Sequence, residues 1–489
     1  MPTPLKNPSP LDRRRLPEPV YDDAPDLVDL YWVAWQQAWD HVVDRDGMAQ
    51  SPYMDEGFDP DTIWIWDTCF MTHFCKYAPH VFPGIESLDN FYRRMYDGAR
   101  LAVKIQHPDN PPLFAWSEEE YVRHTGDLDR VRRVIDGGYL QQHFDFFDSV
   151  PRGSLFDYSN IPTELERADR GYRWNGVCSG MDNTPRAGKQ GVGGTYGDIF
   201  WFDATAQQAL SARSIARLAR LVGAESLATR FDAQHARLVG SLDTFWDNAD
   251  AIYYDRNDSD PFDFHRVRTP AAYWPLLAGA CSPAQANALA AKLTDPDCFG
   301  GAVPWPSVAR DDPAFRGSGH YWRGGVWVPM AYMSARALAD SGHEAVAATA
   351  TRQLLDHMAR TYREYEPASI WEAYAADAGR PSTGKDDAYV VRPDFCGWSA
   401  LAPISMLIEH VLGFRVDAIE RTVTWRRPGG RAGIRRLRCG ASTLSVVDDH
   451  GLVTAEIGAA PLTLVVDGRR LDLEPGRHTV DLRPDLRPA

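Results

Sequence analysis

The sequence predicts a mainly α-helical fold built from helical hairpins, followed by a small C-terminal β domain. From about residue 24 to residue 414, apolar side chains recur at three- and four-residue steps, as they do on the buried face of a helix. After Phe414 the pattern changes to short alternating or β-branched runs that end at turn residues. We therefore expect an N-terminal extension over residues 1–23, a helical domain over 24–414 and a β domain over 415–489.

The first predicted helix lies within residues 22–47. Ala24 and Pro25 form a typical helix start, and Gly47 provides a stop signal. The apolar positions that define its buried face are Leu27, Tyr31, Trp35, Trp39 and Val42.

Three later segments share one pattern, in which two helices of similar length flank a single glycine. Glycine at this place suits the left-handed conformation that ends many helices. The pairs are 111–125 and 127–147 around Gly126, 198–222 and 224–246 around Gly223, and 326–341 and 343–365 around Gly342. We expect about eleven or twelve helices, mostly in antiparallel hairpins. A closed ring of six hairpins is one economical way to bury all of them.

Long connections rich in Gly, Pro and Trp join the predicted hairpins. They span residues 48–66, 151–197, 297–325 and 366–397. Loops of this length in a compact domain are usually functional. The unusual motifs of the chain fall in or directly beside these connections.

The C-terminal segment is predicted to form a β-sandwich-like unit of about 75 residues. Nothing in it suggests catalysis, so we expect it to pack against the helical domain. Its predicted strands are 421–427, 442–449, 452–458, 461–468, 469–476 and 477–483.

Composition narrows the range of functions. The 489-residue chain has a net charge of −15 and no basic stripe of the kind that binds nucleic acid, so a neutral or cationic substrate fits better than a polyanion. No run approaches the ~18 apolar residues of a membrane span, and no secretory signal is visible. Seven cysteines without a CxxC pair indicate reduced thiols. We expect a cytoplasmic protein with neither a nucleic-acid nor a membrane partner.

Tryptophan is abundant before the β domain, where 15 of the 16 tryptophans lie. Aromatic rings pack on the C–H face of sugars, so this excess is compatible with a carbohydrate site. Large helical cores also use tryptophan, and composition alone favours neither interpretation.

The first unusual stretch is DTIWIWDTCFMTHF, residues 61–74. Trp64 and Trp66 alternate, as on an extended segment that leads into a helix beginning near Thr68. Asp67 either caps that helix by accepting backbone N–H bonds or accepts two sugar hydroxyls beside a tryptophan platform.

The second stretch is WNGVCSGMDNTPR, residues 174–186. Asp182 lies here on an irregular loop among Gly, Asn, Thr and Pro. An aspartate in a turn most often stabilises the turn itself, and that interpretation is the simpler one for this stretch alone.

The third and fourth stretches are GHYWRGGVWVPM, residues 319–330, and SIWEAYAADAGRPSTGKDD, residues 369–387. The glycine pair of the third stretch would let the backbone approach a ligand closely; alternatively, its arginine stacks on core tryptophans.

In the fourth stretch, Glu372 lies between aromatic residues, and Lys385 follows. A carboxylate there is costly to bury without a partner, so it is either at the surface or tuned for chemistry.

Two loop carboxylates in aromatic surroundings, Asp182 and Glu372, match what glycosidic hydrolysis requires. One protonated acid must meet the leaving oxygen, and a second carboxylate must handle water or the anomeric carbon. Seven tryptophans lie in or beside the special stretches: 64, 66, 174, 322, 327, 371 and 398.

Signals for metals and nucleotides are weaker. Residues 191–197, GVGGTYG, do not fit a dinucleotide-binding pattern. His73 and Cys75 are two residues apart on a predicted helix and cannot easily face one metal. The acidic run 255–265 lacks EF-hand spacing. We expect no metal and no cofactor.

The motifs WIWD, SGMDNTPR, YWRGGVW and EAYAADAGRPSTGK, in this order, resemble the inverting α-glycosidases of glycoside hydrolase family 63 and the neighbouring trehalase family. These families include bacterial α-glucosidases and mannosylglycerate hydrolases. The resemblance covers nearly all of residues 20–414. It implies an (α/α)6 barrel without a cofactor, an active site at one mouth, and exo-acting hydrolysis of an α-glucoside, a related α-linked oligosaccharide or a small glycoside.

The resemblance also implies residue roles. Asp182 would be the general acid and Glu372 the general base that activates water, while Trp64, Trp66 and Asp67 would hold the sugar. The further residues expected to bind substrate are Trp116, Trp174, Asn183, Arg186, Tyr321, Trp322, Arg323, Gly324, Trp327, Tyr374 and Trp398.

Three departures from the family pattern bear on which substrate is used more than on the chemistry. Many relatives have Gly-Pro at Gly324-Gly325, Glu-Asn-Tyr-Asn-Pro at residues 372–376, and glutamine at Asn110. Two other functions stay open: a sugar epimerase, isomerase or lyase on an α/α barrel with a base such as His320, and a non-catalytic carbohydrate-binding protein.

Overall fold

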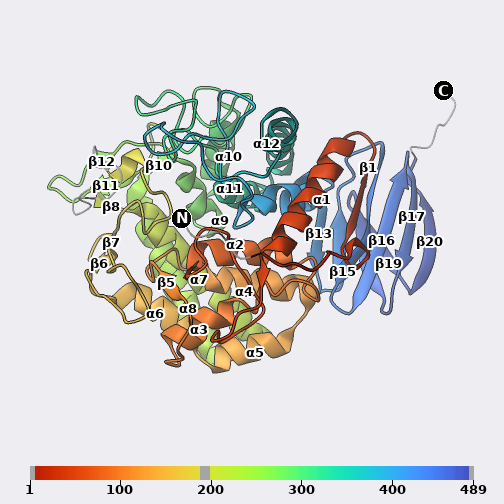
Figure 1. The fold of residues 1–489 in the computed structure, drawn as a ribbon, viewed down its shortest axis with the longest axis horizontal. Helices are drawn as coiled ribbons and strands as arrows, with labels where there is room; N and C mark the ends of the chain where they lie inside the picture. Colours follow the sequence, from red (N-terminus) through yellow and green to blue (C-terminus); the bar gives the residue numbers. More distant parts are fainter. Residues whose placement is uncertain (1–5, 188–198, 484–489) are drawn as a thin grey trace.

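The computed structural model describes residues 6–187 and 199–483. Helices dominate up to Val411, and strands follow from Phe414 onward. Figure 1 shows the helical region beside a separate stack of C-terminal strands. The predicted class, helix-rich with a C-terminal β region, is confirmed.

The described residues contain twelve α-helices and six shorter or wider helical segments. The α-helices are α1 Pro25–Asp40, α2 Ile65–Cys75, α3 Leu88–Met95, α4 Phe114–Thr125, α5 Leu128–Asp136, α6 Tyr139–Ser149, α7 Phe202–Leu221, α8 Glu225–Leu242, α9 Trp274–Leu277, α10 Pro283–Thr294, α11 Val328–Asp340 and α12 Glu344–Glu364. The others are the 3-10 helices η1 Arg13–Arg15, η2 Pro185–Ala187, η3 Asp243–Phe245, η4 Pro270–Tyr273 and η5 Ser399–Leu401, and the π-helix η6 Ala402–Val411.

Six of these helices contact one another in cyclic order. α2 packs on α4, α4 on α7, α7 on α9, α9 on α11, α11 on η6, and η6 on α2. Every residue of α2 and of η6 is buried, as expected for helices that are surrounded on all sides. α8 and α12 pack outside α7 and α11, so the helical region shares one core.

The three predicted hairpin glycines adopt the expected conformation. Gly126, Gly223 and Gly342 follow α4, α7 and α11 and have φ values of 71°, 77° and 84°. Each lets the chain leave a helix in the left-handed region, which side chains with a Cβ rarely occupy.

Two helix boundaries differ from the prediction. α1 ends at Asp40, and Val42 belongs to a short strand, so Gly47 lies in a later turn and does not end the helix. The predicted helix over 127–147 is two helices, because Gly138 has a φ of 69° and breaks the run between α5 and α6.

The C-terminal strands form two sheets. One has the order β1-β15-β16-β17-β20 and the other β13-β14-β18-β19, in which β14 and β18 are parallel. Their bounds are β1 Glu18–Tyr21, β13 Phe414–Asp417, β14 Thr422–Trp425, β15 Arg431–Cys439, β16 Ser442–Asp449, β17 Leu452–Ile457, β18 Leu462–Val466, β19 Arg469–Leu473 and β20 Gly476–Asp481.

Three of these strands were not predicted. β1 comes from the N-terminal extension and pairs antiparallel with β15, more than 400 residues later in the chain. β15 itself is rich in arginine, and a register shift between Ile434 and Leu437 interrupts its alternation. β13 begins where the expected helical domain ends. The N-terminal extension is therefore part of the C-terminal sheet.

Short strands within the helical region tie the connections together in pairs or threes. They are β2 Val42–Val43, β3 Tyr53–Met54, β4 Thr62–Trp64, β5 Lys104–Gln106, β6 Glu166–Ala168, β7 Gly171–Arg173, β8 Ile199–Phe200, β9 Trp246–Asp247, β10 Ile252–Tyr253, β11 Asp255–Asn257 and β12 Phe264–His265. Among the described residues, no helix is both long enough and apolar enough to cross a membrane.

Candidate active site

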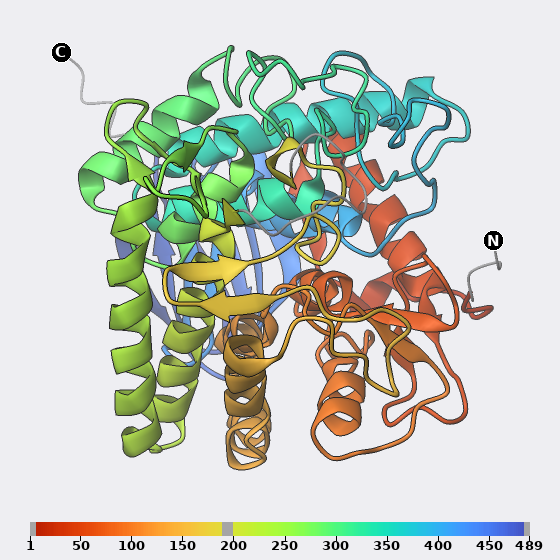
Figure 2. The ribbon, with the colours of Figure 1, turned by 90° about the vertical axis from the view of Figure 1, so that its left-hand side faces the viewer.

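The connection that carries Asp182 lies at the end of the helical region that faces away from the β domain. In Figure 2, the β6–β7 hairpin of this connection lies in front and the C-terminal strands lie behind the helices. α4 runs between the two ends. Before its first turn, Asn110 Nδ2 donates to the carbonyl of Cys178 at 2.8 Å. Near its last turn, Arg123 pairs with Asp417 of the β domain at 2.8 Å.

The loop that carries Asp182 is fixed by close packing at two glycines. A Cβ at Gly176 would lie 2.3 Å from the carbonyl oxygen of Asp182, and a Cβ at Gly180 would lie 3.0 Å from the ring of Trp66. Gly180 also has a φ of 84°. Only glycine fits such close approaches, so the two glycines of the local sequence fix the course of the loop around Asp182.

Asp182 is partly exposed and forms an ion pair. Its Oδ2 lies 2.6 Å from Nζ of Lys385, and 22% of its side chain is exposed. Burial raises the pKa of Asp182, and Lys385 opposes this by favouring the carboxylate; the net shift is upward. Asp182 therefore keeps its proton to a higher pH than an ordinary aspartate does.

Glu372 is almost fully buried and accepts two hydrogen bonds. The Tyr321 hydroxyl donates to Oε1 at 2.8 Å, and the backbone N–H of Arg392 donates to Oε2 at 3.2 Å. Burial raises the pKa of Glu372, while these two donors act in the opposite direction. Trp398 fixes the backbone by donating its Nε1–H to the Glu372 carbonyl at 2.9 Å.

Asp67 is a third carboxyl group of this region and is buried, as Glu372 is. It lies in the first turn of α2, which begins at Ile65, so it is not the cap residue of that helix. Burial raises the pKa of Asp67 well above its usual value, and the charges of Glu372 and Asp182 raise it further. The three carboxyl groups therefore come from distant connections to one region, where like charges disfavour simultaneous ionisation.

Asn183 joins the loop of Asp182 to the loop of Tyr321. Its Nδ2 donates to the His320 carbonyl at 3.0 Å, and its Oδ1 accepts from the backbone N–H of Trp322 at 2.8 Å. Arg323 Nε donates to the Asn183 carbonyl at 3.0 Å. Asn183 and Arg323 therefore hold the two loops in a fixed relation.

The backbone at His320 and Tyr321 is strained. Both residues have positive φ, 40° and 60°, which is uncommon outside glycine. Hydrogen bonds from both backbone N–H groups to Thr383, at 3.0 and 2.9 Å, keep this conformation. His320 Nδ1 also lies 2.9 Å from Asp387 Oδ2. Strain held in this way is typical of functional sites, and here it aims the Tyr321 hydroxyl at Glu372.

Gly324 serves a different purpose from the one expected. A Cβ at this position would lie 2.0 Å from the carbonyl oxygen of Arg316, and φ is 151°. The close approach that requires glycine is therefore to the chain itself. A ligand contact at Gly324 stays a prediction.

Aromatic side chains form a packed layer next to Glu372. Trp322 and Trp327 stack with their ring centroids 4.1 Å apart, and Tyr321 and Trp398 meet Trp327 edge-on at 4.7 and 5.6 Å. Tyr374 is buried, and its hydroxyl accepts from the backbone N–H of Trp371 at 3.1 Å. These contacts position the loop that carries Glu372.

The other tryptophans that were expected to bind a sugar differ in how much of their side chain is exposed. Trp64 is partly exposed and meets Phe58 edge-on at 5.0 Å. Trp66 is 2% exposed and lies against Gly180 in the loop that carries Asp182. Trp116 and Trp174 are buried in the core, and Trp174 packs against Phe147 and Trp201. Because none of its surface is exposed, Trp174 offers no face to a substrate in this structure, and the expectation that it binds substrate has no support here.

Arg186 is a structural residue. It is fully buried, and it pairs with both Asp203 and Asp255 at 2.7 Å. Its Nη1 and Nη2 donate to the two carboxylate oxygens of Asp203, and its Nη2 and Nε donate to those of Asp255. Nη1 also donates to the Met181 sulfur. All five N–H groups of a guanidinium are thereby used. The expectation that Arg186 binds substrate is corrected, because no donor is left for a sugar.

Sequence reasoning missed three polar groups at this end. Lys385 stood in the fourth stretch, but its pairing with Asp182 is a contact across 203 residues of chain. Arg392 donates its backbone N–H to Glu372. Glu56 is fully buried, and burial together with the charges of Asp55 and Asp67 raises its pKa well above the usual value. None has a local pattern that marks it.

Two weaker signals remain without support. Residues 191–197 lie outside the described residues. His73 and Cys75 are both buried on α2, and neither belongs to the group of potential metal ligands that the described residues contain.

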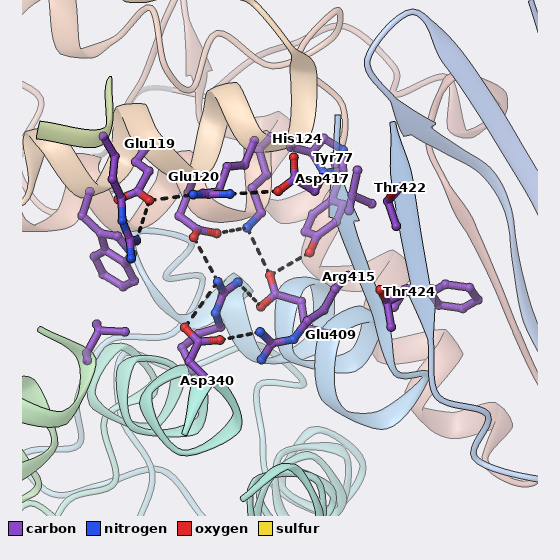
Figure 3. Close-up of a pocket in the computed structure, with 18 of the residues that line it drawn as sticks. Tyr77, Glu119, Glu120, His124, Asp340, Glu409, Arg415, Asp417, Thr422 and Thr424 are labelled. Atoms are coloured by element: carbon purple, nitrogen blue, oxygen red, sulfur yellow. Dashed lines mark hydrogen bonds and ion pairs between the residues drawn. The ribbon is translucent and has the colours of Figure 1, made fainter. Parts of the chain in front are cut away.

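A pocket of about 290 Å³ lies at the opposite end, between the helical region and the β domain (Figure 3). Its walls carry paired charges: Lys76 with Glu120 and Glu409 at 3.0 and 3.2 Å, and Arg336 with the same two glutamates at 2.9 Å. Burial alone would raise the pKa of Glu409, but Lys76 and Arg336 hold it well below the usual value. This network joins core helices, and the three carboxyl groups lie elsewhere.

Comparison with known proteins points to carbohydrate chemistry. A family model described as "Mannosylglycerate hydrolase MGH1-like glycoside hydrolase domain" matches residues 103–389. An uncharacterised protein of Borreliella burgdorferi is 22% identical over 441 residues, 86% of each chain. A probable mannosyl-oligosaccharide glucosidase of Schizosaccharomyces pombe is 23% identical over 74% of this chain and 50% of its own length. A mannosylglycerate hydrolase of Thermus thermophilus is 33% identical over 25% of this chain and 29% of its own.

Solved structures with the same fold include three carbohydrate-active proteins by name. A sialidase superposes with a TM-score of 0.71 at 12% identity, over 91% of this chain but 40% of that one. The family 63 mannosylglycerate hydrolase of Thermus thermophilus, solved with Tris and D-glycerate, gives 0.56 at 17% identity over 77% and 99%. Neutral trehalase of Saccharomyces cerevisiae gives 0.53 at 13% identity over 75% and 76%. These likenesses concern the fold.

Proposed function

Because the chain belongs to the family of MGH1-like glycoside hydrolase domains, we propose that it hydrolyses an α-glycosidic bond with inversion at the anomeric carbon. Asp182 acts as the general acid and Glu372 as the general base. The single observation that carries this assignment is that two carboxyl groups with different partners, Lys385 on one and Tyr321 on the other, meet where the Lys385 ammonium lies 5.1 Å from the Tyr321 ring centroid. Different environments give two carboxyl groups different roles.

Asp182 suits the role of proton donor. Its raised pKa favours the protonated form, and its side chain is the more exposed of the two, with 22% accessible against 2% for the whole of Glu372. The Lys385 side chain is itself 30% exposed, so an arriving substrate can displace it. The proton of Asp182 then passes to the glycosidic oxygen as the bond to the anomeric carbon breaks.

Glu372 suits the role of base. Its two hydrogen bonds, from the Tyr321 hydroxyl and the Arg392 backbone, stabilise the carboxylate. Glu372 removes a proton from water as the water oxygen attacks the anomeric carbon from the face opposite the leaving group. The products are a free sugar of inverted configuration and the aglycone with its oxygen protonated. The next cycle requires a proton to return to Asp182 and to leave Glu372.

The substrate we propose is an α-glucoside or a related small glycoside, cleaved from its end. The names of the relatives support two aglycone classes, an oligosaccharide and a glycerate. Trp64 and Phe58 offer a partly exposed aromatic edge for a sugar ring, and Asp67 offers a carboxyl group for its hydroxyls. Lys385 would pair with an anionic aglycone once Asp182 is protonated.

The remaining proposals concern architecture and location. We take the six helices in cyclic contact, with their outer partners, as an (α/α)6 barrel. The domain limits proposed are 24–414 and 415–489, and residues 1–23 form the N-terminal extension, whose strand β1 joins the C-terminal sheet. Seven free cysteines support a cytoplasmic location.

A substrate panel tests the proposed function. Purified protein is incubated with α-linked disaccharides, α-glucosyl- and α-mannosyl-glycerates and matched β-linked compounds, and released monosaccharide is measured. We expect hydrolysis of at least one α-glycoside and none of the β-linked set. Asp182→Asn and Glu372→Gln are the matched negative controls. Hydrolysis of β-glycosides alone, or activity that survives in both variants, would contradict the proposal.

A further inference from the structure

Three potential metal ligands meet at the acid loop, residues 174–186 around Asp182. His107 and Asp109 lie between β5 and α4, and Cys178 lies four residues before Asp182. One ligand atom from each of the three side chains lies within 4.8 Å of the other two. All three residues are buried, with exposures of 7%, 0% and 1%.

The carboxyl group of Asp109 is oriented for a further partner. Its Oδ2 accepts the backbone N–H groups of Glu164 and Leu165 at 2.8 and 3.0 Å, which fixes the plane of the carboxylate. Its Oδ1 is buried and accepts no hydrogen bond of ordinary geometry, and the weakly donating Cys178 thiol lies beside the carboxyl group. A fully buried oxygen without a strong partner is costly. A cation bound at this position would satisfy it.

The spacing of sulfur and nitrogen matches a tetrahedral zinc site. Cys178 Sγ lies 3.5 Å from His107 Nδ1. Zinc binds thiolate sulfur at about 2.3 Å and imidazole nitrogen at about 2.0–2.1 Å, so these two ligands lie about 3.6 Å apart in a tetrahedron. Cys, His and Asp are the residue types that bind zinc in proteins. The backbone N–H groups of Glu164 and Leu165, which donate to Asp109, supply the kind of outer hydrogen bonding that orients a metal ligand.

We propose that His107, Asp109 and Cys178 form a binding site for a thiophilic divalent cation, Zn²⁺ in particular, which fastens the acid loop to the segment before α4. Binding converts the Cys178 thiol to a thiolate and releases its proton to solvent. The imidazole binds through Nδ1 and the carboxylate through Oδ1, and water takes the fourth position. The cation changes no oxidation state and is not part of glycoside cleavage.

The site lies where a cation would affect the position of Asp182. The backbone of Cys178 is already held by Asn110 at its carbonyl and by Asn175 at its N–H, at 2.8 and 2.7 Å. A bond from the side chain to a metal would add a third anchor four residues before the proposed acid. We therefore expect bound Zn²⁺ to stabilise the fold and to tighten the acid loop.

Cobalt spectroscopy tests the site independently of any hydrolysis. The full chain is freed of metal with a chelator and titrated with Co²⁺, which gives a thiolate-to-cobalt absorption band when a cysteine binds it. We expect this band to saturate at one Co²⁺ per chain and to disappear when Zn²⁺ is added. Cys178→Ser should abolish the band, whereas Cys298→Ser, which alters a buried cysteine elsewhere, should retain it.

Zn²⁺ affinity provides the second readout. In competition with a chromophoric chelator, Cys178→Ser and His107→Gln should each bind Zn²⁺ more than about 100-fold more weakly than the parent, since the loss of an outer partner alone costs 10- to 100-fold. Both should unfold at the temperature of the parent protein in the presence of chelator, and only the parent should gain thermal stability from Zn²⁺. Absence of the cobalt band in the parent, or unchanged Zn²⁺ affinity in both variants, would overturn the proposal. The three side chains would then form hydrogen bonds only.

Discussion

Lys385 Nζ lies 2.6 Å from Asp182 Oδ2, so the proposed proton donor rests in an ion pair. The cation favours the ionised form, whereas burial favours the protonated form, and burial prevails in the net upward shift of the pKa of Asp182. Lys385 therefore sets the upper pH at which the acid still holds its proton.

The first prediction concerns Lys385→Met. Removing the cation raises the pKa of Asp182, because the carboxylate loses its counter-charge. Since catalysis requires Asp182 to be protonated, the alkaline limb of the kcat/KM profile should move to higher pH. Lys292→Met, on α10, is the control and should leave the profile unchanged. An alkaline limb that stays in place or moves to lower pH would mean that another group controls it.

The second prediction concerns Tyr321→Phe, which removes the hydroxyl that donates to Glu372. The pKa of Glu372 should rise, because the hydrogen bond stabilises the carboxylate. The base must be ionised, so the acidic limb of kcat/KM should move to higher pH. The plateau should fall by about tenfold, as expected for a hydrogen bond to a charged group.

Tyr362→Phe, on α12, serves as the control for that experiment. It removes a hydroxyl on the outer helix and should change neither limb. If Tyr321→Phe also left the acidic limb in place, Glu372 would not be the group that titrates there.

The third prediction concerns stability and Arg186. Arg186→Met leaves the carboxylates of Asp203 and Asp255 buried without their partner, and loss of one member of such a network costs about 3–5 kcal/mol. Urea unfolding should show this loss. Arg132→Met breaks a pair at the surface and should cost no more than about 1 kcal/mol. If Arg186→Met kept its stability but raised KM, Arg186 would bind substrate after all.

The fourth prediction concerns Glu409 in the pocket between the helical region and the β domain. Its pKa is depressed in the folded state, so its pairing stabilises the protein above the unfolded-state value of about 4.3 and is lost as pH falls towards the folded-state value. The difference in Tm between the parent and Glu409→Gln should therefore be largest near neutral pH and shrink below about pH 4. A difference that stays constant across this range would show that packing, and not charge, is lost.

Local chemistry predicted the parts of the fold that depend on neighbouring residues. Gly126, Gly223 and Gly342 were recognised as helix ends because a left-handed residue favours glycine whatever the tertiary context. The pairing of β1 with β15 was missed, since a four-residue strand has little pattern and its partner lies at the other end of the chain. The strand β15 was missed because its many arginines and its register shift between Ile434 and Leu437 obscure the alternating pattern of a strand.

In the candidate site, too, features that depend on neighbouring residues could be predicted and contacts between distant residues could not. Asp182 and Glu372 were found because unusual loops and a family pattern surround them, and their roles stay predictions. Arg186 was misjudged because it follows Asp182 closely, whereas its partners Asp203 and Asp255 are placed by the fold. The meeting of Cys178 with His107 spans 71 residues and leaves no local trace.

The reaction's stereochemistry is the most direct test of Asp182 and Glu372 as an acid–base pair. Proton NMR, recorded during the first turnovers on an α-glucoside that the protein cleaves, identifies the anomer formed before mutarotation. Both Asp182→Asn and Glu372→Gln should stay folded and lose about 10²–10⁴-fold in turnover, as expected for loss of a general acid or base. With the parent protein we predict that β-glucose forms first. Initial formation of α-glucose would contradict inversion and the role of Glu372 as the base that activates water.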